Sequence, residues 1–186
     1  KIEMAKPSLM TSEDAVLRIE CASTCGTDLH IYRGAIPGFV PGTVIGHEFT
    51  GWIETIGTAV KRFKPGQRVR CSDFAACGYC TDCIAGCHAQ CTQRLLFGFS
   101  GIQPRLDGGL AEFVRVPWAD TVLDPLSEST DARVGLLAAD VLPTALGALE
   151  LCHLQNNSHI AIIGAGPVGL LTALLACQRG CHPVLL

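Results

Sequence analysis

The chain lacks the features that mark nucleic-acid-binding, membrane-spanning and secreted proteins. Its 186 residues carry a formal net charge of −3 with no block of like charges, so nothing supports binding to a polyanion. Its longest apolar runs, such as residues 168–177, hold about ten residues and are too short to span a membrane. Its first residues, KIEMAKPSLM, lack the apolar core of a signal peptide. We therefore expect a cytoplasmic protein with no nucleic-acid and no membrane partner.

Low-complexity tracts and internal repeats are also absent, whereas cysteine is abundant. Eleven cysteines would suit a disulfide framework in a small secreted chain, but in a cytoplasmic protein they favour metal ligands or buried thiols. At 48% hydrophobic residues, the chain can bury a sizeable core. Five of the cysteines fall in one short stretch, CGYCTDCIAGCHAQC, at residues 77–91.

This cysteine-rich stretch predicts a structural zinc site. Such a site takes four tetrahedral ligands, commonly thiolates, and spacing alone does not identify which of the five cysteines is spare. One choice gives the pattern C-x2-C-x2-C-x7-C, formed by Cys77, Cys80, Cys83 and Cys91. Gly78, Gly86 and the lack of a long apolar run indicate a loop ordered by the ion. The alternative is a loop of free thiols, which would be a liability at this density.

A second group of possible ligands lies upstream, in CASTCGTDLH and GTVIGHEFTG. It comprises Cys25, Asp28, His30, His47 and Glu48. A catalytic zinc needs three protein ligands and an open position. Taken singly, each residue has an ordinary explanation, such as a buried cysteine or a hydrogen-bonded histidine. Their combination favours a metal site.

Together these motifs resemble the zinc-containing medium-chain alcohol dehydrogenase family. The resemblance rests on CGTDLH at residues 25–30, GHEFTG at 46–51, GTAV at 57–60 and the cysteine-rich stretch that follows. It runs from Glu13 to the last residue, and the pattern GHE-x2-G-x5-G-x2-V with that stretch is highly specific. It implies a GroES-like catalytic domain and a Rossmann cofactor domain. It also implies that the structural zinc is held by Cys77, Cys80, Cys83 and Cys91, with Cys87 as the spare.

The resemblance further implies a catalytic zinc held by Cys25, His47 and a third ligand. That ligand precedes the helix leading to the cofactor domain, and in LLAADVLPTALGALE the only candidate there is Asp140. The ordinary explanation of Asp140 is a helix-capping acid. Glu48 is expected to approach the zinc from outside its ligand set or to exchange with water as a ligand. Asp28 is expected to orient His47 by a hydrogen bond, or else to be a turn residue.

A proton path is implied by the same resemblance. Thr27, beside Cys25, would hydrogen-bond the substrate oxygen. His30, three residues on, would carry the proton to water, because histidine exchanges protons near neutral pH. The alternatives are a structural threonine and a surface histidine.

The end of the chain predicts a dinucleotide-binding turn. HIAIIGAGPVGLLTALLACQRG indicates a strand over residues 159–163, a G-x-G-x-x-G turn and a helix that ends near Gly180. The turn would let the backbone approach a pyrophosphate at the helix N-terminus, and its residues are Gly164, Gly166, Pro167, Val168 and Gly169. A tight strand–helix turn of another α/β fold is the alternative. The cofactor is NAD or NADP, since the discriminating residue would follow the strand in CHPVLL.

The predicted fold is mixed α/β in two parts. Alternation and turn signals predict strands at residues 15–21, 52–56, 68–71 and 110–116, as in a β-barrel-like domain, and a short helix capped by Ser129 or Thr130. We assign residues 1–142 to the GroES-like catalytic domain, and residues 143–186 to a linking helix and the first βαβ part of a Rossmann domain. Since a doubly wound sheet needs more strands to cover its faces, the chain is interpreted as part of a longer enzyme, inactive alone.

The predicted function is that of a zinc-dependent NAD(P) alcohol dehydrogenase with a catalytic and a structural zinc. The catalytic zinc would polarise the substrate oxygen while hydride passes between a small alcohol, aldehyde or ketone and the nicotinamide. Threonine and formaldehyde dehydrogenase activities stay open, and the full-length enzyme is expected to be a dimer or tetramer. A non-catalytic zinc module is disfavoured by the joint presence of Cys25, Thr27, His47 and Asp140. A zinc-free quinone reductase is disfavoured by the cysteine stretch and GHE.

Overall fold

The computed structural model of the chain describes residues 3–101 and 104–186. Contacts within the chain divide it into two compact units, Lys1–Leu136 and Leu137–Leu186. This division lies a few residues before the predicted domain boundary at 142/143, which stays a prediction. Within the described residues, no helix has the length and apolar character needed to cross a membrane.

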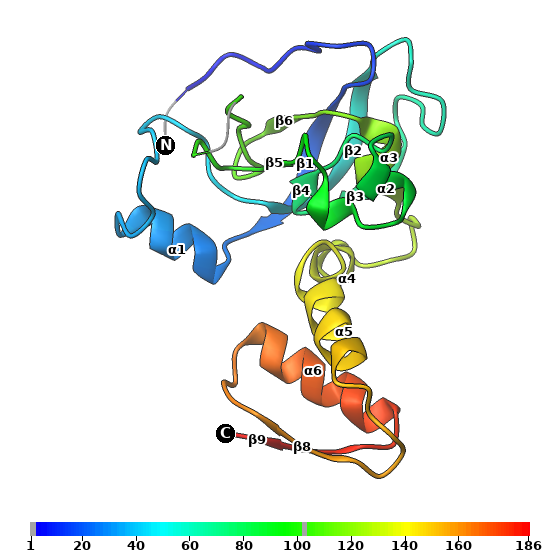
Figure 1. Ribbon diagram of the computed structural model, residues 1–186. Coiled ribbons are helices and arrows are strands. Elements are labelled where there is room, and N and C mark those ends of the chain that lie inside the picture. Colours follow the sequence, from blue (N-terminus) through cyan, green and yellow to red (C-terminus); the bar gives the residue numbers. More distant parts are fainter. Residues whose placement is uncertain (1–2, 102–103) are drawn as a thin grey trace. The chain divides into compact units, whose positions relative to one another are not determined.

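The first unit is built on a five-stranded antiparallel sheet (Figure 1). Its strands, in spatial order, are β6 (Phe113–Val116), β1 (Ala15–Ser23), β2 (Glu48–Ile56), β3 (Arg68–Cys71) and β7 (Leu123–Pro125). The strands predicted from alternation are present, and β2 extends further toward the N-terminus than predicted. Strand β6 starts later than predicted because the backbone N–H groups of residues 108–110 donate instead to carbonyls of residues 44–46.

Shorter elements complete the first unit. They are α1 (Gly26–Tyr32), β4 (Phe74–Ala75), α2 (Thr81–Ile84), the 3-10 helix η1 (His88–Gln90), β5 (Leu95–Leu96), α3 (Ala119–Val122) and α4 (Ala132–Leu137). Helix α4 shows that the predicted cap is wrong. The Asp131 carboxylate accepts a hydrogen bond from Arg133 N at 2.8 Å, so Asp131, rather than Ser129 or Thr130, satisfies the first turn.

The core of the first unit lies between the sheet and the segments that cross it. In β6, Val114 and Val116 are buried and alternate with half-buried residues, as a period of two requires. In β1 the first three residues, 15–17, are all buried. Phe49 and Phe97 meet edge to face with their ring centroids 5.1 Å apart. Burial of such side chains is the main source of stability for the sheet.

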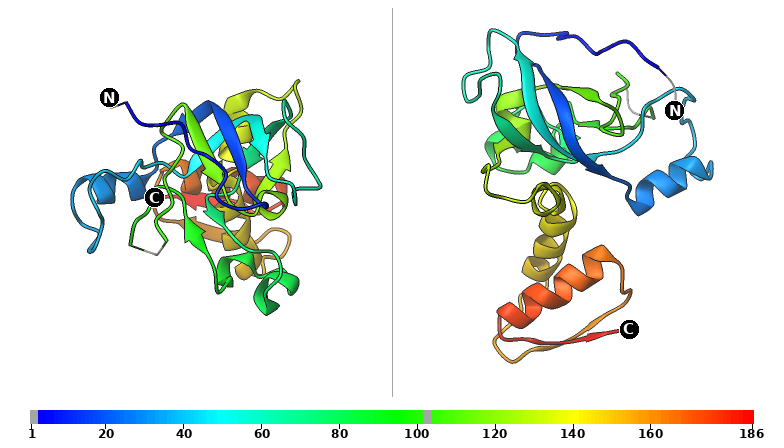
Figure 2. Two further views of the ribbon diagram at one scale, coloured as in Figure 1. Left: turned by 90° about the horizontal axis from the view of Figure 1, so that it is seen from above. Right: turned by 180° about the vertical axis from the view of Figure 1, so that it is seen from behind.

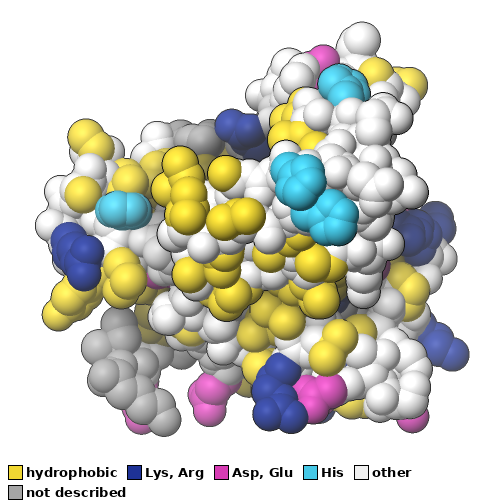
Figure 3. Space-filling view, turned by 90° about the horizontal axis from the view of Figure 1, so that it is seen from below, with side chains coloured by type: hydrophobic (Ala, Val, Ile, Leu, Met, Phe, Trp, Pro, Cys, Tyr) yellow, Lys and Arg dark blue, Asp and Glu magenta, His cyan; other side chains and the backbone are white. Residues whose placement is uncertain are grey.

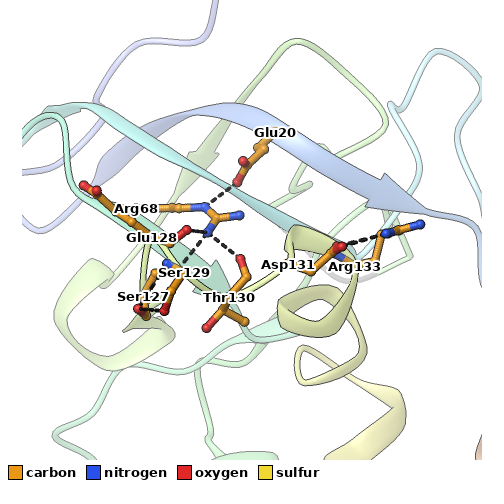
Figure 4. A network of polar contacts seen from close by, with 8 residues as sticks. All are labelled: Glu20, Arg68, Ser127, Glu128, Ser129, Thr130, Asp131 and Arg133. Atoms are coloured by element: carbon orange, nitrogen blue, oxygen red, sulfur yellow. Dashed lines mark hydrogen bonds and ion pairs between the residues drawn. The ribbon is translucent and has the colours of Figure 1, made fainter.

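A buried arginine ties the sheet to the turn before α4 (Figure 4). Arg68 of β3 is only 7% exposed. Its Nε donates to Glu20 Oε2 at 2.7 Å, and its Nη1 donates to the carbonyls of Ser127 at 2.8 Å and Thr130 at 2.7 Å. The guanidinium charge is therefore paired and hydrogen-bonded, which is what allows it to be buried.

The pairing of β1 with β2 brings two distant parts of the sequence together. In the antiparallel register, Ser23 at the end of β1 lies opposite Glu48 at the start of β2. Helix α1 projects from the end of β1, as both views of Figure 2 show. The motifs that begin at Cys25 and Gly46 are thus neighbours because of this register.

The second unit is a small βαβ arrangement preceded by a helix. It contains α5 (Val141–Leu151), β8 (His159–Ile162), α6 (Pro167–Gln178) and β9 (His182–Leu185). Strands β8 and β9 are parallel and α6 connects them, as in the start of a Rossmann sheet. Together with the first unit, this confirms the predicted mixed α/β class.

The second unit buries few of its apolar side chains. Leu149, Ala176 and Cys181 form its small core. Many large apolar residues remain exposed, among them Leu151, Ile163, Leu170, Leu174, Val184 and Leu186. Figure 3 shows hydrophobic side chains gathered over much of the face that it presents.

Candidate metal centres and nucleotide turn

The cysteine lobe, defined as residues 77–91, brings four thiols to one point. The Sγ atoms of Cys77, Cys80, Cys83 and Cys91 all lie within 4.8 Å of one another. Cys77 Sγ is 3.6 Å from Cys91 Sγ and 4.0 Å from Cys83 Sγ. Four sulfurs bonded to zinc at about 2.3 Å in a tetrahedron would lie about 3.8 Å apart. The four thiols therefore fit a zinc ion without rearrangement.

The charges in this lobe are also suited to a cation. Backbone N–H groups of Cys83 and Thr92 lower the pKa of the Cys80 thiol to about 6, whereas burial raises the pKa of Cys83 to about 12. Backbone N–H groups of Cys77 and Gln93 point at Cys91 Sγ, each at 3.4 Å. Backbone donors aimed at sulfur are what thiolates need, and a cation would let all four thiols ionise.

Cys87 stands apart from this cluster. It is exposed, and it lies at the start of η1 rather than among the four grouped thiols. The geometry thus separates four cysteines from the fifth in the same way as the family resemblance does. That the four bind zinc stays a prediction.

The second cluster lies where β1 ends and β2 begins. One ligand atom from each of Cys25, His47 and Glu48 lies within 4.8 Å of the others. Cys25 precedes α1, and His47 and Glu48 enter β2. A thiol, an imidazole and a carboxylate form a donor set that suits zinc.

Asp28 connects the two halves of this cluster through the backbone. Its carboxylate is 2% exposed and accepts hydrogen bonds from Cys25 N at 2.9 Å and from Gly46 N at 3.1 Å. Its Oδ1 lies 3.6 Å from Nδ1 of His47, which is beyond hydrogen-bond length. The expected orientation of His47 by Asp28 therefore takes another form, since Asp28 fixes the backbone of Cys25 itself and of Gly46, the residue before His47.

Gly46 shows why this turn is specific in sequence. Its φ of +97° is a backbone conformation that favours glycine. A Cβ at this position would lie 2.6 Å from the Leu110 side chain. The chain can therefore deliver His47 to the cluster only with glycine before it.

Thr27 and His30 lie on α1, next to the cluster. Thr27 Oγ1 is 3.8 Å from Cys25 Sγ, within reach of a weak hydrogen bond. His30 lies three residues further along the helix and is exposed. The two side chains therefore share one face of α1. Both are exposed, and Thr27 is the one that lies near the sulfur.

Asp140 belongs to the second unit. It occupies the N-cap position of α5, yet its side chain makes no capping hydrogen bond to the backbone. Its Oδ1 accepts a hydrogen bond from the Thr144 hydroxyl at 3.1 Å. The helix-capping explanation of this acid therefore has no support, and its role as a ligand stays a prediction.

The glycine-rich turn of the second unit has the predicted local geometry. Gly164 has a φ of +106°, Gly166 is the N-cap of α6, and Pro167 is in the first turn of that helix. A Cβ on Gly169 would lie 2.0 Å from the Gly164 carbonyl oxygen. Gly164 and Gly169 thus have a steric reason to be glycine, whereas a Cβ on Gly166 would meet nothing within 4 Å. Val168 follows Pro167 in the same turn of helix. Cofactor binding by these residues stays a prediction.

Sequence reasoning missed one residue at the second cluster. The Ser23 hydroxyl donates a hydrogen bond to Glu48 Oε2. Its position two residues before Cys25 is visible in the sequence, but its partner depends on the strand register.

Known proteins with similar sequences and structures include alcohol dehydrogenases and related dehydrogenases. The uncharacterized zinc-type alcohol dehydrogenase-like protein AdhB of Bacillus subtilis is 30% identical over 193 residues, which cover 98% of this chain and 51% of that protein. L-threonine 3-dehydrogenase of Bacillus velezensis is 32% identical, with 96% and 50% covered. The structure of alcohol dehydrogenase TADH from Thermus sp. ATN1 matches with a TM-score of 0.93 and 35% identity, over 99% of this chain and 53% of that one.

The chain thus spans about half the length of the relatives it matches. Residues 11–126 match the family of the alcohol dehydrogenase GroES-like domain, and this segment is more than half of the 186 residues. The chain therefore belongs to the zinc-type medium-chain alcohol dehydrogenase family.

Proposed function

We propose that this chain provides the metal-binding catalytic domain and the first part of the dinucleotide-binding domain of a zinc-dependent NAD(P) alcohol dehydrogenase. The observation that carries the proposal is the convergence of Cys25, His47 and Glu48 at the meeting ends of β1 and β2. The same unit also holds a separate four-thiol cluster. A purely structural zinc module would need only the latter.

The residues assigned to metal fall into two sets. Cys25, His47 and Asp140 would hold the catalytic zinc, and the cysteine lobe would hold the structural zinc through Cys77, Cys80, Cys83 and Cys91. When bound, the catalytic zinc supplies Lewis-acid chemistry to the substrate oxygen. Since Nδ1 of His47 faces Asp28, we assign Nε2 as the nitrogen that binds the metal.

Two side chains of the protein would carry the hydroxyl proton of the alcohol from the substrate to water. The Thr27 hydroxyl, near Cys25, would hydrogen-bond the substrate oxygen and would accept its proton while passing its own hydroxyl proton on in the direction of His30. His30, exposed on the same face of α1, would pass a proton on to water. Thr27 and His30 thus span the distance from the cluster to the surface on one short helix.

The glycine-rich turn would bind the cofactor's pyrophosphate. Backbone N–H groups at the start of α6 attract anions, and the glycines permit close approach. The proposed contacts are Gly164, Gly166, Pro167, Val168 and Gly169. The hydride acceptor or donor is NAD or NADP, and the substrate is a small alcohol or the corresponding aldehyde or ketone.

Two alternatives of narrower scope remain within the proposal. A threonine dehydrogenase activity is favoured by the similarity to a protein of that name. A formaldehyde dehydrogenase activity is the alternative that the family resemblance implies. The full-length protein is proposed to be a homo-oligomer. A non-catalytic zinc module is the competing function, with metal in the cysteine lobe alone.

Counting zinc per chain tests the proposal. We expect about two zinc ions in the wild-type chain by elemental analysis, falling to about one in Cys25→Ser. One zinc in both proteins would favour the non-catalytic module. With two ions established, alcohol oxidation with NAD and NADP would be assayed on a full-length enzyme that carries this segment.

A further inference from the structure

Ser23 and Glu48 form a cross-strand pair at the edge of the second metal cluster. Ser23 is the last residue of β1 and Glu48 the first of β2, and the register places them opposite each other. The Ser23 hydroxyl donates to Glu48 Oε2. Because the strand ladder fixes both backbones, this hydrogen bond restrains the carboxylate rather than the chain.

The Glu48 carboxylate therefore faces two partners. It is 5% exposed, and one of its oxygens lies within 4.8 Å of the Cys25 and His47 ligand atoms. A buried carboxylate needs hydrogen bonds or a cation, and here both kinds of partner are within reach. A metal bound by Cys25 and His47 would compete with the serine hydroxyl for it.

That competition matters because a catalytic metal must keep one position open. A carboxylate that binds the metal permanently would fill that position. A hydroxyl that donates to the carboxylate occupies a lone pair and favours the orientation in which the hydrogen bond is kept. The Ser23 hydrogen bond thus acts against full coordination by Glu48.

We propose that Ser23 is a positioning residue whose hydroxyl holds the Glu48 carboxylate back from the metal at Cys25 and His47. The inference rests on the proposed function, since it requires a metal at that cluster. Removing the hydroxyl releases the carboxylate to become an additional ligand. Cys25, His47 and Glu48 together would then hold a metal more tightly than Cys25 and His47 do with Glu48 held back.

Cobalt substitution tests this proposal, because the visible spectrum of bound Co²⁺ depends on the number and type of its ligands. The 186-residue chain is loaded with Co²⁺, and the spectrum of the Cys25→Ser chain is subtracted to remove the contribution of the cysteine lobe. In Ser23→Ala we expect a changed visible d–d spectrum and loss of metal to a chelator slowed by about 10-fold, the low end of effects from residues that orient ligands. Ser23→Thr keeps a hydroxyl and should restore the wild-type spectrum and rate.

Two further variants separate positioning from a structural effect. In a Glu48→Gln background no carboxylate is available, so Ser23→Ala should then change neither spectrum nor release rate. Ser127→Ala removes an exposed hydroxyl on a turn and serves as the control. Circular dichroism checks that each variant is folded.

The possible results distinguish failure of the Ser23 inference from failure of the proposed function. Identical spectra and release rates in folded wild-type and Ser23→Ala chains overturn the inference, and so does an effect of Ser23→Ala that persists with Gln at position 48. A wild-type chain without Cys25-dependent cobalt overturns the proposed function as well. That failure is visible before any Ser23 variant is compared.

Discussion

The two metal clusters of the first unit are built in opposite ways. The cysteine lobe takes all four thiols from one short stretch, residues 77–91, folded around α2 and η1. The second cluster takes Cys25 from the end of one strand and His47 and Glu48 from the start of another. The first depends on local spacing, whereas the second depends on how β1 and β2 pair.

Their surroundings differ as well. Cys77, Cys83 and Cys91 are buried in a small core of their own, against which Trp118 also packs. Near the second cluster, Thr27 and His30 are exposed on α1. A closed set of four thiols is suited to holding structure, and an accessible mixed set is suited to exchanging ligands.

Removing a ligand from the cysteine lobe should have the largest effect on zinc content and thermal stability. Cys83→Ser removes a buried thiol from the four, and structural zinc in such sites contributes on the order of 10–16 kcal/mol of binding free energy. We expect loss of one zinc ion and a clear drop in melting temperature, measured by elemental analysis and calorimetry.

Cys87→Ser is the matched control for that prediction, because Cys87 is exposed and outside the group. It should leave zinc content and melting temperature unchanged. Loss of zinc in Cys87→Ser would mean that the fifth cysteine, rather than one of the other four, is the ligand.

Breaking the second cluster should cost metal but little stability. In His47→Asn we expect one zinc ion fewer, with the lobe still loaded, because this cluster lies at strand ends rather than within the main core. Elemental analysis and thermal unfolding on the same samples measure both effects. His88→Asn, an exposed histidine of η1, should change neither quantity. A large fall in melting temperature for His47→Asn would contradict the inference that the second cluster contributes less to stability than the cysteine lobe.

The contrast also explains what the sequence could predict. The spacing of Cys77, Cys80, Cys83 and Cys91 is a local property, so the grouping of these thiols followed from the residues and the family resemblance. The turn at Gly164–Gly169 is local in the same way, and its geometry has the predicted form. The strand at residues 15–21 followed from alternation with a period of two, and the strand at 68–71 from the turn signals that flank it.

Side-chain contacts that depend on the pairing register of β1 and β2 could not be predicted from the sequence. A slip of one residue between β1 and β2 would turn Ser23 away from Glu48, and nothing in either segment alone specifies the pairing. Asp28 was predicted to orient His47, but its hydrogen bonds go to backbone groups that only the folded turn brings near. Asp131 replaced the predicted caps because several polar residues compete at the start of α4, and geometry decides among them.

Asp28→Asn should loosen the second cluster without touching the lobe. The buried carboxylate accepts from two backbone N–H groups, and an amide offers only one oxygen for them, so one donor is left without its partner. We expect metal affinity at the second cluster to fall by about 10- to 100-fold, as for other residues that orient ligands. Metal titration monitored after the lobe is saturated measures this change.

Asp107→Asn is the control for Asp28. Its carboxylate also accepts a backbone hydrogen bond in the loop before His47, from Val44 N at 3.0 Å, which is two residues further from His47 than Gly46 is. Affinity at the second cluster should stay within a factor of two or so of wild type. Equal losses in both variants would mean that general loop order, not the link between Cys25 and Gly46, supports the metal.

His30→Gln should have the smallest effect on metal and stability, because His30 is exposed and outside both ligand groups. Zinc content and melting temperature should match wild type. In a full-length enzyme that carries this segment, however, loss of the imidazole should change the shape of the pH–rate profile and slow turnover, since general acid–base groups contribute roughly 100-fold or more. Added imidazole should recover part of the rate if the side chain only carries protons. An unchanged profile would leave His30 as a surface residue, and the difference between the two clusters would then lie in their ligands alone.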